Sequence, residues 1–169
     1  MATILRLTLI AGFACLFTSC VTTTERTRVT QTKPAATGSG ERFQKVRTTA
    51  YTHGEGSGPR NAVGRPLAGG GCKSAAADWS RFPVGTRFRV VSTGQEYVVD
   101  DYGTALIGTN TIDLYKDSSA EMHRWGVRHV DIEILQLGSR DESLKILRPR
   151  HRARIVRRMI ASLETRKTS

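Results

Sequence analysis

Asp101-Tyr102-Gly103-Thr104-Ala105-Leu106-Ile107-Gly108, followed by Thr111-Ile112-Asp113-Leu114-Tyr115, is the stretch that decides the fold. It places two carboxylates at the ends of short apolar runs, with a glycine-bounded turn between them. A third carboxylate, Asp78, lies upstream. Carboxylates with this spacing are brought together only by a compact β fold. Two or three converging carboxylates can act as acid and base on a glycosidic bond.

Most other patterns between residues 45 and 137 are those of β-strands, because strand-forming or alternating side chains recur. The predicted strands are residues 46–52, 87–91, 96–99 and 130–135. Thr93-Gly94 is a hairpin signal. Residues 54–71 hold many glycines and two prolines, which predicts a long loop. Residues 118–126 predict a short helix with a serine cap and a terminal Gly126. We therefore expect one mainly β domain over residues 45–137.

Short pieces across this domain match a known family in order and spacing. They are Thr49-Ala50-Tyr51-Thr52, Ala76-Ala77-Asp78, Phe82-Pro83-Val84-Gly85-Thr86, Asp101-Tyr102-Gly103, Ile107-Gly108 and Ile112-Asp113-Leu114-Tyr115. The segment resembles the 3D (three-aspartate) domain family, which is related to the catalytic domain of membrane-bound lytic transglycosylase A and, more distantly, to rare lipoprotein A and expansins. The resemblance implies a six-stranded double-psi β-barrel in which Asp78, Asp101 and Asp113 face one cleft.

The same resemblance implies lytic cleavage of peptidoglycan between MurNAc and GlcNAc, with a 1,6-anhydro product. We expect no cofactor and no metal. We expect Asp101 and Asp113 to be the catalytic pair and Asp78 to orient them. One carboxyl would serve first as acid and then as base, which requires a raised pKa. Substrate contacts are expected from the residues around the carboxylates. These are Thr49, Tyr51, Tyr102, Gly103, Thr104 and Tyr115.

The chain departs from the family pattern at two places, which leave the carboxylates in place but motivate an alternative function. Asp-Thr-Gly-Gly-Ala is usual where this chain has Asp101-Tyr102-Gly103-Thr104-Ala105, and one extra residue separates Gly108 from Asp113. The chain is also too short for the second domain with which the larger transglycosylase grips glycan. The alternative is a non-catalytic module that binds peptidoglycan or loosens the wall.

Several groups also have simpler interpretations. Asp78 can cap a turn, and Asp100 should point away from Asp101 if the strand is extended, so we expect it to be solvated. Three aspartates can bind Ca²⁺, but the close ligand spacing of a calcium loop is missing. Residues 69–74 lack the Gly-Lys pair of a phosphate loop. Cys72 has no local activating group, so we expect a packed thiol rather than a nucleophile.

The first twenty residues predict export. Arg6 precedes the short apolar core of residues 7–17, which is too short to span a bilayer comfortably. The core leads into Phe17-Thr18-Ser19-Cys20, which resembles a lipobox. Cys20 is therefore the predicted lipidation site, with ordinary signal cleavage and an uncleaved anchor as alternatives. Residues 21–44 are polar and small, which predicts a flexible tether.

We expect this anchor to hold the protein in the cell envelope. Val21 is not the Asp of inner-membrane retention, so resemblance to Gram-negative lipoproteins favours the outer membrane, facing the periplasm.

The net charge of +11 belongs largely to the C-terminal tail. Residues 45–137 contain eleven Lys/Arg against ten Asp/Glu, whereas residues 138–169 contain ten against three. The domain therefore has no nucleic-acid footprint, and nucleic acid is not an expected partner. Residues 152–163 predict a helix with an apolar stripe among arginines. The stripe fits a helix docked on the barrel or frayed in solvent, or contact with anionic lipid or wall polymer.

Overall fold

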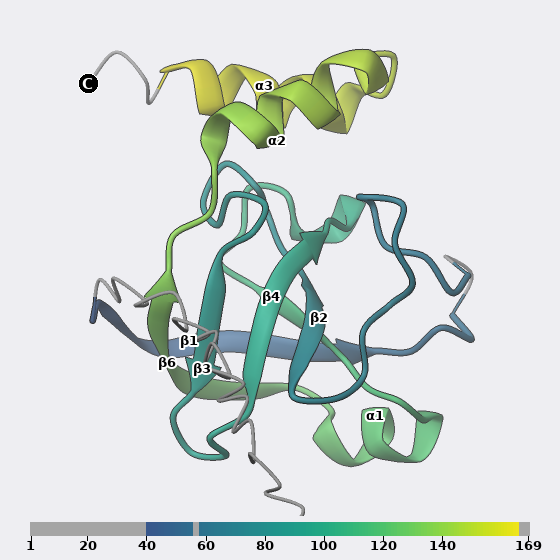
Figure 1. Ribbon diagram of the computed structural model, residues 1–169, viewed down its shortest axis with the longest axis vertical. Helices are drawn as coiled ribbons and strands as arrows, with labels where there is room; N and C mark the ends of the chain where they lie inside the picture. The colour runs from purple at the N-terminus through teal and green to yellow at the C-terminus, as the bar shows by residue number, and fades with distance from the viewer. Residues whose placement is uncertain (1–39, 56–57, 166–169) are drawn as a thin grey trace, which may run out of the picture. The chain divides into compact units, whose positions relative to one another are not determined.

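The six strands of the described residues form one closed β-barrel (Figure 1). The computed structural model describes residues 40–55 and 58–165, all within one compact unit. The strands are β1 (Arg42–Tyr51), β2 (Cys72–Ala76), β3 (Arg87–Val90), β4 (Glu96–Asp101), β5 (Ile112–Tyr115) and β6 (Arg128–Gln136). The expectation of a mainly β fold with six barrel strands is confirmed. The export signal, Cys20 and most of the expected tether lie outside the described residues, and β1 begins at Arg42, before the predicted boundary at residue 45.

The strands follow the order β1-β5-β2-β4-β3-β6 around the barrel. Two neighbouring pairs are parallel, β1 with β5 and β2 with β4, and the other four are antiparallel. The Thr93-Gly94 hairpin signal is confirmed, because β3 and β4 pair as neighbours and the Gly94 amide closes the turn onto the Val90 carbonyl at 2.8 Å. Gly94 has φ +69°, a conformation that glycine adopts without steric cost.

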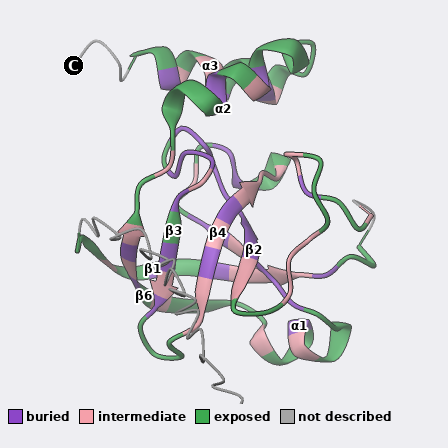
Figure 2. Cartoon of the chain, in the orientation of Figure 1, coloured by how far each residue is buried: buried purple, intermediate pink, exposed green. Residues whose placement is uncertain are grey.

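Alternating side chains fill the barrel interior. Phe88 of β3 and Tyr97 of β4 stack at 5.5 Å between ring centroids, and neither ring is exposed by more than 1%. Ile132 and Ile134 alternate inward from β6 and are equally buried. Buried residues lie on the strands and in the loop between β2 and β3, whereas most positions of the three helices are exposed or intermediate (Figure 2). Removing these side chains from water is the main favourable contribution to the fold.

The helix α1 (Ser119–Trp125) confirms the predicted short helix between β5 and β6. The Ser118 side chain accepts a hydrogen bond from the Glu121 amide, as an N-cap does. Gly126 ends the helix with φ +58°, and its amide donates to the Met122 carbonyl. Ser118 and Gly126, which the sequence predicted as the two ends of this helix, therefore mark its start and its end.

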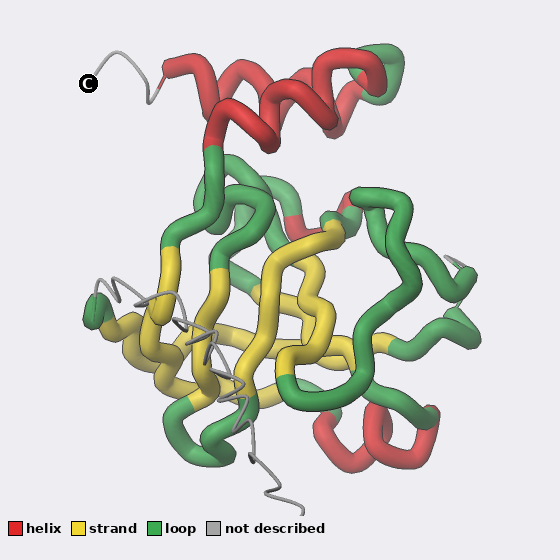
Figure 3. The backbone as a smooth tube through the Cα atoms, viewed as in Figure 1, coloured by secondary structure: helices red, strands yellow, loops and turns green. Residues whose placement is uncertain are grey.

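Two C-terminal helices follow β6 and pack against the end of the barrel opposite α1 (Figure 3). They are α2 (Arg140–Leu147) and α3 (Arg154–Thr165), joined through the short helix η2 (Arg148–Arg150). Gly138 leads into α2 so close to the loop before β3 that a Cβ would lie 2.3 Å from the Pro83 and Val84 carbonyl oxygens. The Ser143 hydroxyl of α2 also accepts the Val84 amide at 3.0 Å. The docked form of the basic tail is confirmed.

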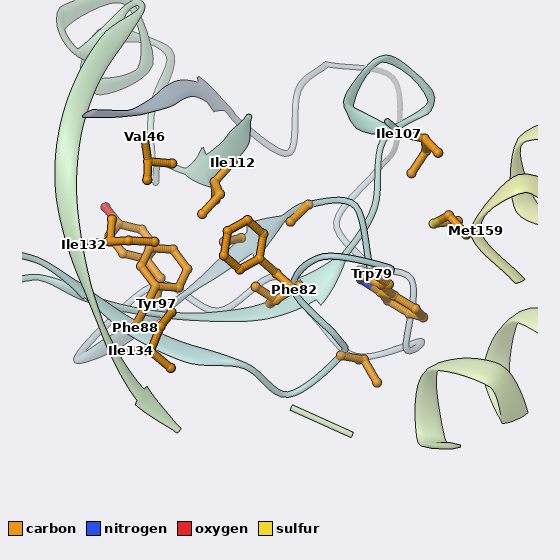
Figure 4. Packing of buried hydrophobic residues seen from close by; sticks show 14 of the residues in the cluster. Val46, Trp79, Phe82, Phe88, Tyr97, Ile107, Ile112, Ile132, Ile134 and Met159 are labelled. Carbon is orange, nitrogen blue, oxygen red and sulfur yellow. The ribbon is translucent and has the colours of Figure 1, made fainter. Parts of the chain in front are cut away.

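The apolar stripe of the tail joins the barrel core. Val156, Met159 and Leu163 of α3 are buried and belong to the same hydrophobic cluster as Ile107 and Trp79 of the barrel. Figure 4 shows Met159 on the side of the cluster where Ile107 lies. Within the described residues, no helix combines the length and apolar character that a bilayer crossing requires.

Candidate functional site

A single row of residues crosses four adjacent strands and contains two of the predicted aspartates. Thr49 of β1 pairs with Asp113 of β5, Asp113 pairs with Ala76 of β2, and Ala76 pairs with Asp101 of β4. Paired positions on neighbouring strands direct their side chains to the same face. The barrel therefore brings Asp101 and Asp113 together on either side of Ala76, with about 10 Å between their Cα atoms from two strand spacings.

A β-bulge in β4 sets the direction of Asp101. Ala75 pairs with Val99, but the next residue, Ala76, pairs with Asp101, so two residues of β4 lie opposite one step of β2. Without the bulge Asp101 would share the inward direction of Val99, which is fully buried in the core. The extra residue turns Asp101 out of the core, which is a recurrent use of bulges beside functional sites.

The bulge also corrects the prediction for Asp100. We expected a solvated side chain, but the Asp100 carboxylate is half-buried and its Oδ2 accepts hydrogen bonds from Asn61 Nδ2 and Ser74 Oγ, both at 2.8 Å. Its Oδ1 is buried without a hydrogen-bond partner among the described residues. Extended-strand alternation fails here because the bulge inserts a residue, so both carboxylates lie beneath the loop between β1 and β2.

This loop also holds Asp101. The Asp101 Oδ1 accepts the Ala62 amide of the loop at 3.1 Å and the Tyr102 amide at 2.8 Å. Asp113 is held differently, because its Oδ1 accepts a hydrogen bond from a side chain, the Thr49 hydroxyl, at 2.6 Å. Asn61, Ala62 and Ser74 therefore belong to the surroundings of the carboxylates. Sequence reasoning missed them, since nothing in a glycine-rich loop indicates which amide reaches a strand 39 residues away.

All three neighbouring carboxyls have a raised pKa, and burial is the largest cause in each case. The negative charge of Asp100 raises the pKa of Asp101 further, and the charges of Glu55 and Asp101 do the same for Asp113. The hydrogen bonds from Tyr102 and Thr49 act in the opposite direction, since they stabilise the ionised forms. Protonation of one carboxyl beside an ionised neighbour is therefore favoured.

Two predicted tyrosines lie in the next row of the same face. Tyr51 pairs with Tyr115 across β1 and β5, and their rings meet edge-on at 5.6 Å. Burial, followed by the charges of Asp101, Asp100 and Asp113, raises the pKa of Tyr51. Its hydroxyl is buried without a hydrogen-bond partner among residues 40–55 and 58–165. The Tyr115 hydroxyl is 3.0 Å from His53 Nδ1, so this ring is packed rather than open for stacking.

Asp78 lies in different surroundings. It is 2% exposed, its Oδ1 accepts the Ser80 amide at 2.9 Å and its Oδ2 accepts the Gly108 amide at 2.7 Å. It borders a 370 Å³ pocket that Arg158 of α3 also lines, whereas Asp101 and Asp113 are not among the residues of that pocket. These contacts are those of the turn-capping interpretation, and they tie the loop between β2 and β3 to the loop before β5.

The remaining predicted contacts lie on the turn after β4. Tyr102 packs edge-on against Trp79 at 5.1 Å, Gly103 precedes the short helix η1 (Thr104–Leu106), and the Thr104 side chain is exposed. Arg150 of η2 reaches this turn: it donates to the Ala62 carbonyl at 2.8 Å and to the Tyr102 hydroxyl at 3.5 Å. Its charge lowers the pKa of Asp101. The C-terminal helices thus supply a cation to the carboxylate site.

A groove of about 460 Å³ lies along the start of β1. Phe43, Phe82 and Arg47 are among its lining residues, and the two phenylalanine rings meet at 5.9 Å. Arg47 also donates to the Thr111 hydroxyl and lowers the pKa of Asp113, so it lies between groove and carboxylate. Phe82 is a buried core residue, so Phe43 and Arg47 are the more accessible of these three residues. An aromatic ring beside a cation is suited to a sugar chain with anionic substituents.

Cys72 at the start of β2 is half-buried, and burial raises the pKa of its thiol. A raised pKa leaves less thiolate at neutral pH, and the thiolate is the nucleophile. The expectation of a packed, unreactive thiol agrees with this environment.

Comparison with known families agrees with this geometry. Residues 73–136 match the model of a family described as 3D domain. This segment is a 3D domain. The match covers β2 to β6 with all three predicted aspartates, confirms the resemblance found in the sequence, and is consistent with a peptidoglycan-related domain. No curated protein sequence shows significant similarity to the chain.

Proposed function

We propose that this protein cleaves peptidoglycan glycan strands lytically, with Asp101 and Asp113 as the catalytic pair. The observation that carries the proposal is the row of Thr49, Asp113, Ala76 and Asp101, in which both carboxyls have a raised pKa. A raised pKa shifts a carboxyl towards the protonated form that a general acid requires. The 3D match and the aromatic groove support a glycan as the substrate.

In the proposed reaction the protonated carboxyl donates its proton to the oxygen that leaves C1 of MurNAc. The carboxylate that remains then takes the proton from the C6 hydroxyl of the same sugar. That hydroxyl oxygen bonds to C1, so the products are a 1,6-anhydro MurNAc end and a free GlcNAc hydroxyl. The carboxylate ends the cycle protonated again, and no water is consumed. The second carboxylate stabilises the positive charge that develops at C1.

The proposal gives Asp78 a supporting role, because both of its oxygens are occupied by backbone amides. Tyr51, Tyr102 and Thr104 are proposed to contact the sugar beside the pair. The six-stranded closed barrel has the strand number of a double-psi barrel, and we include the double-psi connection among the proposed features.

The test is digestion of purified peptidoglycan, with the soluble products analysed by mass spectrometry. We expect 1,6-anhydro muropeptides from the wild type, and a loss of at least a hundredfold in Asp101→Asn and Asp113→Asn, as for removal of a general acid or base. Asp131→Asn is the matched control, since Asp131 is an exposed barrel aspartate outside the carboxylate row and its Oδ1 accepts a hydrogen bond from the Lys45 amide. Equal product release by all four proteins contradicts the assignment. Binding to insoluble peptidoglycan without products supports the non-catalytic alternative instead.

We further propose that Cys20 carries a lipid that anchors the protein in the cell envelope, at the outer membrane where the host has one. This proposal rests on the sequence Phe17-Thr18-Ser19-Cys20. Metabolic labelling with a fatty-acid probe should mark the wild type and Cys15→Ala but not Cys20→Ala. Equal labelling of both cysteine variants removes Cys20 as the attachment site.

A further inference from the structure

A second, differently charged cavity lies beside α1. Its volume is about 240 Å³, and it is lined by Lys73, Thr93, Gln95, Tyr97, Lys116, Glu121, Arg124, Trp125 and Arg128. Tyr97 and Asp101 are four residues apart on β4, which separates this cavity from the carboxylate row by about 13 Å along the strand. None of the residues of the proposed catalytic row lines it. It is therefore a separate candidate site.

A buried cation lies at the cavity wall. The Lys116 side chain belongs to a residue only 9% exposed, and its Nζ donates to the Tyr97 hydroxyl at 2.8 Å. The same Nζ lies 4.1 Å from the ring centroid of Trp125, so the ring face stabilises the charge. An ammonium has three N–H donors, and Tyr97 takes one of them. Burial and then the charge of Lys73 lower the pKa of Lys116, an effect that a bound anion would reverse.

Further cations surround this ammonium. The Arg128 guanidinium lies 4.7 Å from the Trp125 ring centroid, and Arg124 lines the same cavity. Lys73 is paired with Asp117 at 2.5 Å, so its charge is partly compensated. The cavity therefore favours an anion small enough to reach Lys116 between the arginines.

The cavity also contains one carboxylate that needs a donor. Glu121 is the only acidic residue among those that line it. Its Oε2 is buried and has no hydrogen-bond partner among the described residues. A buried acceptor without a donor is costly, so its presence here indicates a position for a ligand N–H or ammonium.

From these two features we propose that the cavity binds an α-amino-acid group, its carboxylate at Lys116 and the arginines and its ammonium at Glu121 Oε2. The group has two sources: a free amino acid, or the unlinked centre of a diamino acid in a wall peptide. The proposal does not depend on glycan cleavage, because it uses no residue of the carboxylate row.

The test is a titration of the full chain, monitored by the indole N–H signal of Trp125 in NMR spectra. The probes are alanine, a muropeptide with a free diamino-acid centre, and two blocked analogues: N-acetylalanine, which lacks the ammonium, and alaninamide, which lacks the carboxylate. We expect either alanine or a muropeptide with a free diamino-acid centre to bind at least tenfold more tightly than both blocked analogues, and the tighter of the two identifies the source. Affinities equal to those of the blocked analogues, or no shift of the Trp125 signal with either ligand, would overturn the proposal.

Two variants separate the charges. Lys116→Met keeps an apolar stem against Trp125. It should lower the affinity for alanine and N-acetylalanine at least tenfold but leave the affinity for alaninamide unchanged. Glu121→Gln keeps the side-chain shape. It should lower the affinity for alanine and alaninamide but leave the affinity for N-acetylalanine unchanged. Lys145→Met, an exposed change on α2, is the control and should change none of the affinities. Because Glu121→Gln is nearly isosteric, it keeps the test valid if Lys116→Met does not fold. An unchanged alanine affinity in folded Glu121→Gln contradicts the assignment.

Discussion

The Tyr51 hydroxyl should lower the stability of the fold, so Tyr51→Phe should raise it. The hydroxyl is buried without a hydrogen-bond partner among the described residues and lies in the field of three carboxylates. An unsatisfied buried polar group costs about 1–3 kcal/mol, and the substitution removes that cost. The phenylalanine ring keeps the edge-on contact with Tyr115 at 5.6 Å, so little packing is lost. We expect the free energy of unfolding to increase by about 1–2 kcal/mol.

Urea unfolding followed by circular dichroism measures this change. The m-value should stay constant while the midpoint increases, and the Tm should increase by about 3–5 °C per kcal/mol for a domain of this size. Tyr97→Phe is the matched control: the Tyr97 hydroxyl accepts from Lys116 at 2.8 Å, so its removal leaves a buried ammonium with one partner fewer. That variant should lose about 1–3 kcal/mol. A Tyr51→Phe protein less stable than the wild type, or the same sign for both variants, would refute the reasoning.

Three further outcomes follow from the carboxylates. Because burial raises the pKa of Asp113, its contribution to stability is present below the unfolded-state pKa and is lost as pH rises through the folded-state pKa. Asp113→Asn should therefore be more stable than the wild type at pH 7 and lose that advantage towards pH 3, which thermal unfolding across pH can check. Asp78→Asn should lose about 1–3 kcal/mol, because an amide nitrogen cannot accept the amide of Ser80 or Gly108, and hydrogen exchange at the affected amide should accelerate. Arg150→Ala removes a charge that lowers the pKa of Asp101, so the alkaline limit of 1,6-anhydro product release should move to higher pH, while Arg150→Lys should retain most of the wild-type profile.

Helix caps and turns could be predicted from the sequence, because each depends on residues that are close together in the chain. The Ser118 cap, the Gly126 terminus and the Thr93-Gly94 hairpin all depend on residues within one turn of each other, and the structure uses each as expected. The strand β2 was not predicted as a strand. Its residue Ala75 is fully buried between β4 and β5, so tertiary pairing, not β propensity, makes this segment a strand.

The candidate site was predictable in its two main carboxylates but not in their surroundings. The family pattern identified Asp101 and Asp113, and strand pairing through Ala76 brings them together. The position of Asp100 depends on a bulge, which changes side-chain direction without a composition signal. The occupied oxygens of Asp78 likewise depend on the loop at Gly108, thirty residues further along the chain. Such contacts between residues far apart in the sequence form only when the barrel closes, so local sequence patterns do not predict them.

The basic tail shows why an amphipathic pattern alone cannot identify its partner. An apolar stripe among arginines fits the surface of a barrel or of a membrane equally well. In the structure Met159 and Leu163 are completely buried within the barrel cluster, so these side chains are not free to enter a bilayer. Contact of the folded tail with an anionic surface is then limited to its exposed arginines, such as Arg154 and Arg157, and must weaken with salt. Co-sedimentation of the unlipidated chain with anionic liposomes should therefore decrease steeply between about 50 and 500 mM salt, with a Debye length that falls from about 14 to 4 Å. Binding that persists at high salt would show that the helices leave the barrel and insert their stripe, which contradicts the packing of α3.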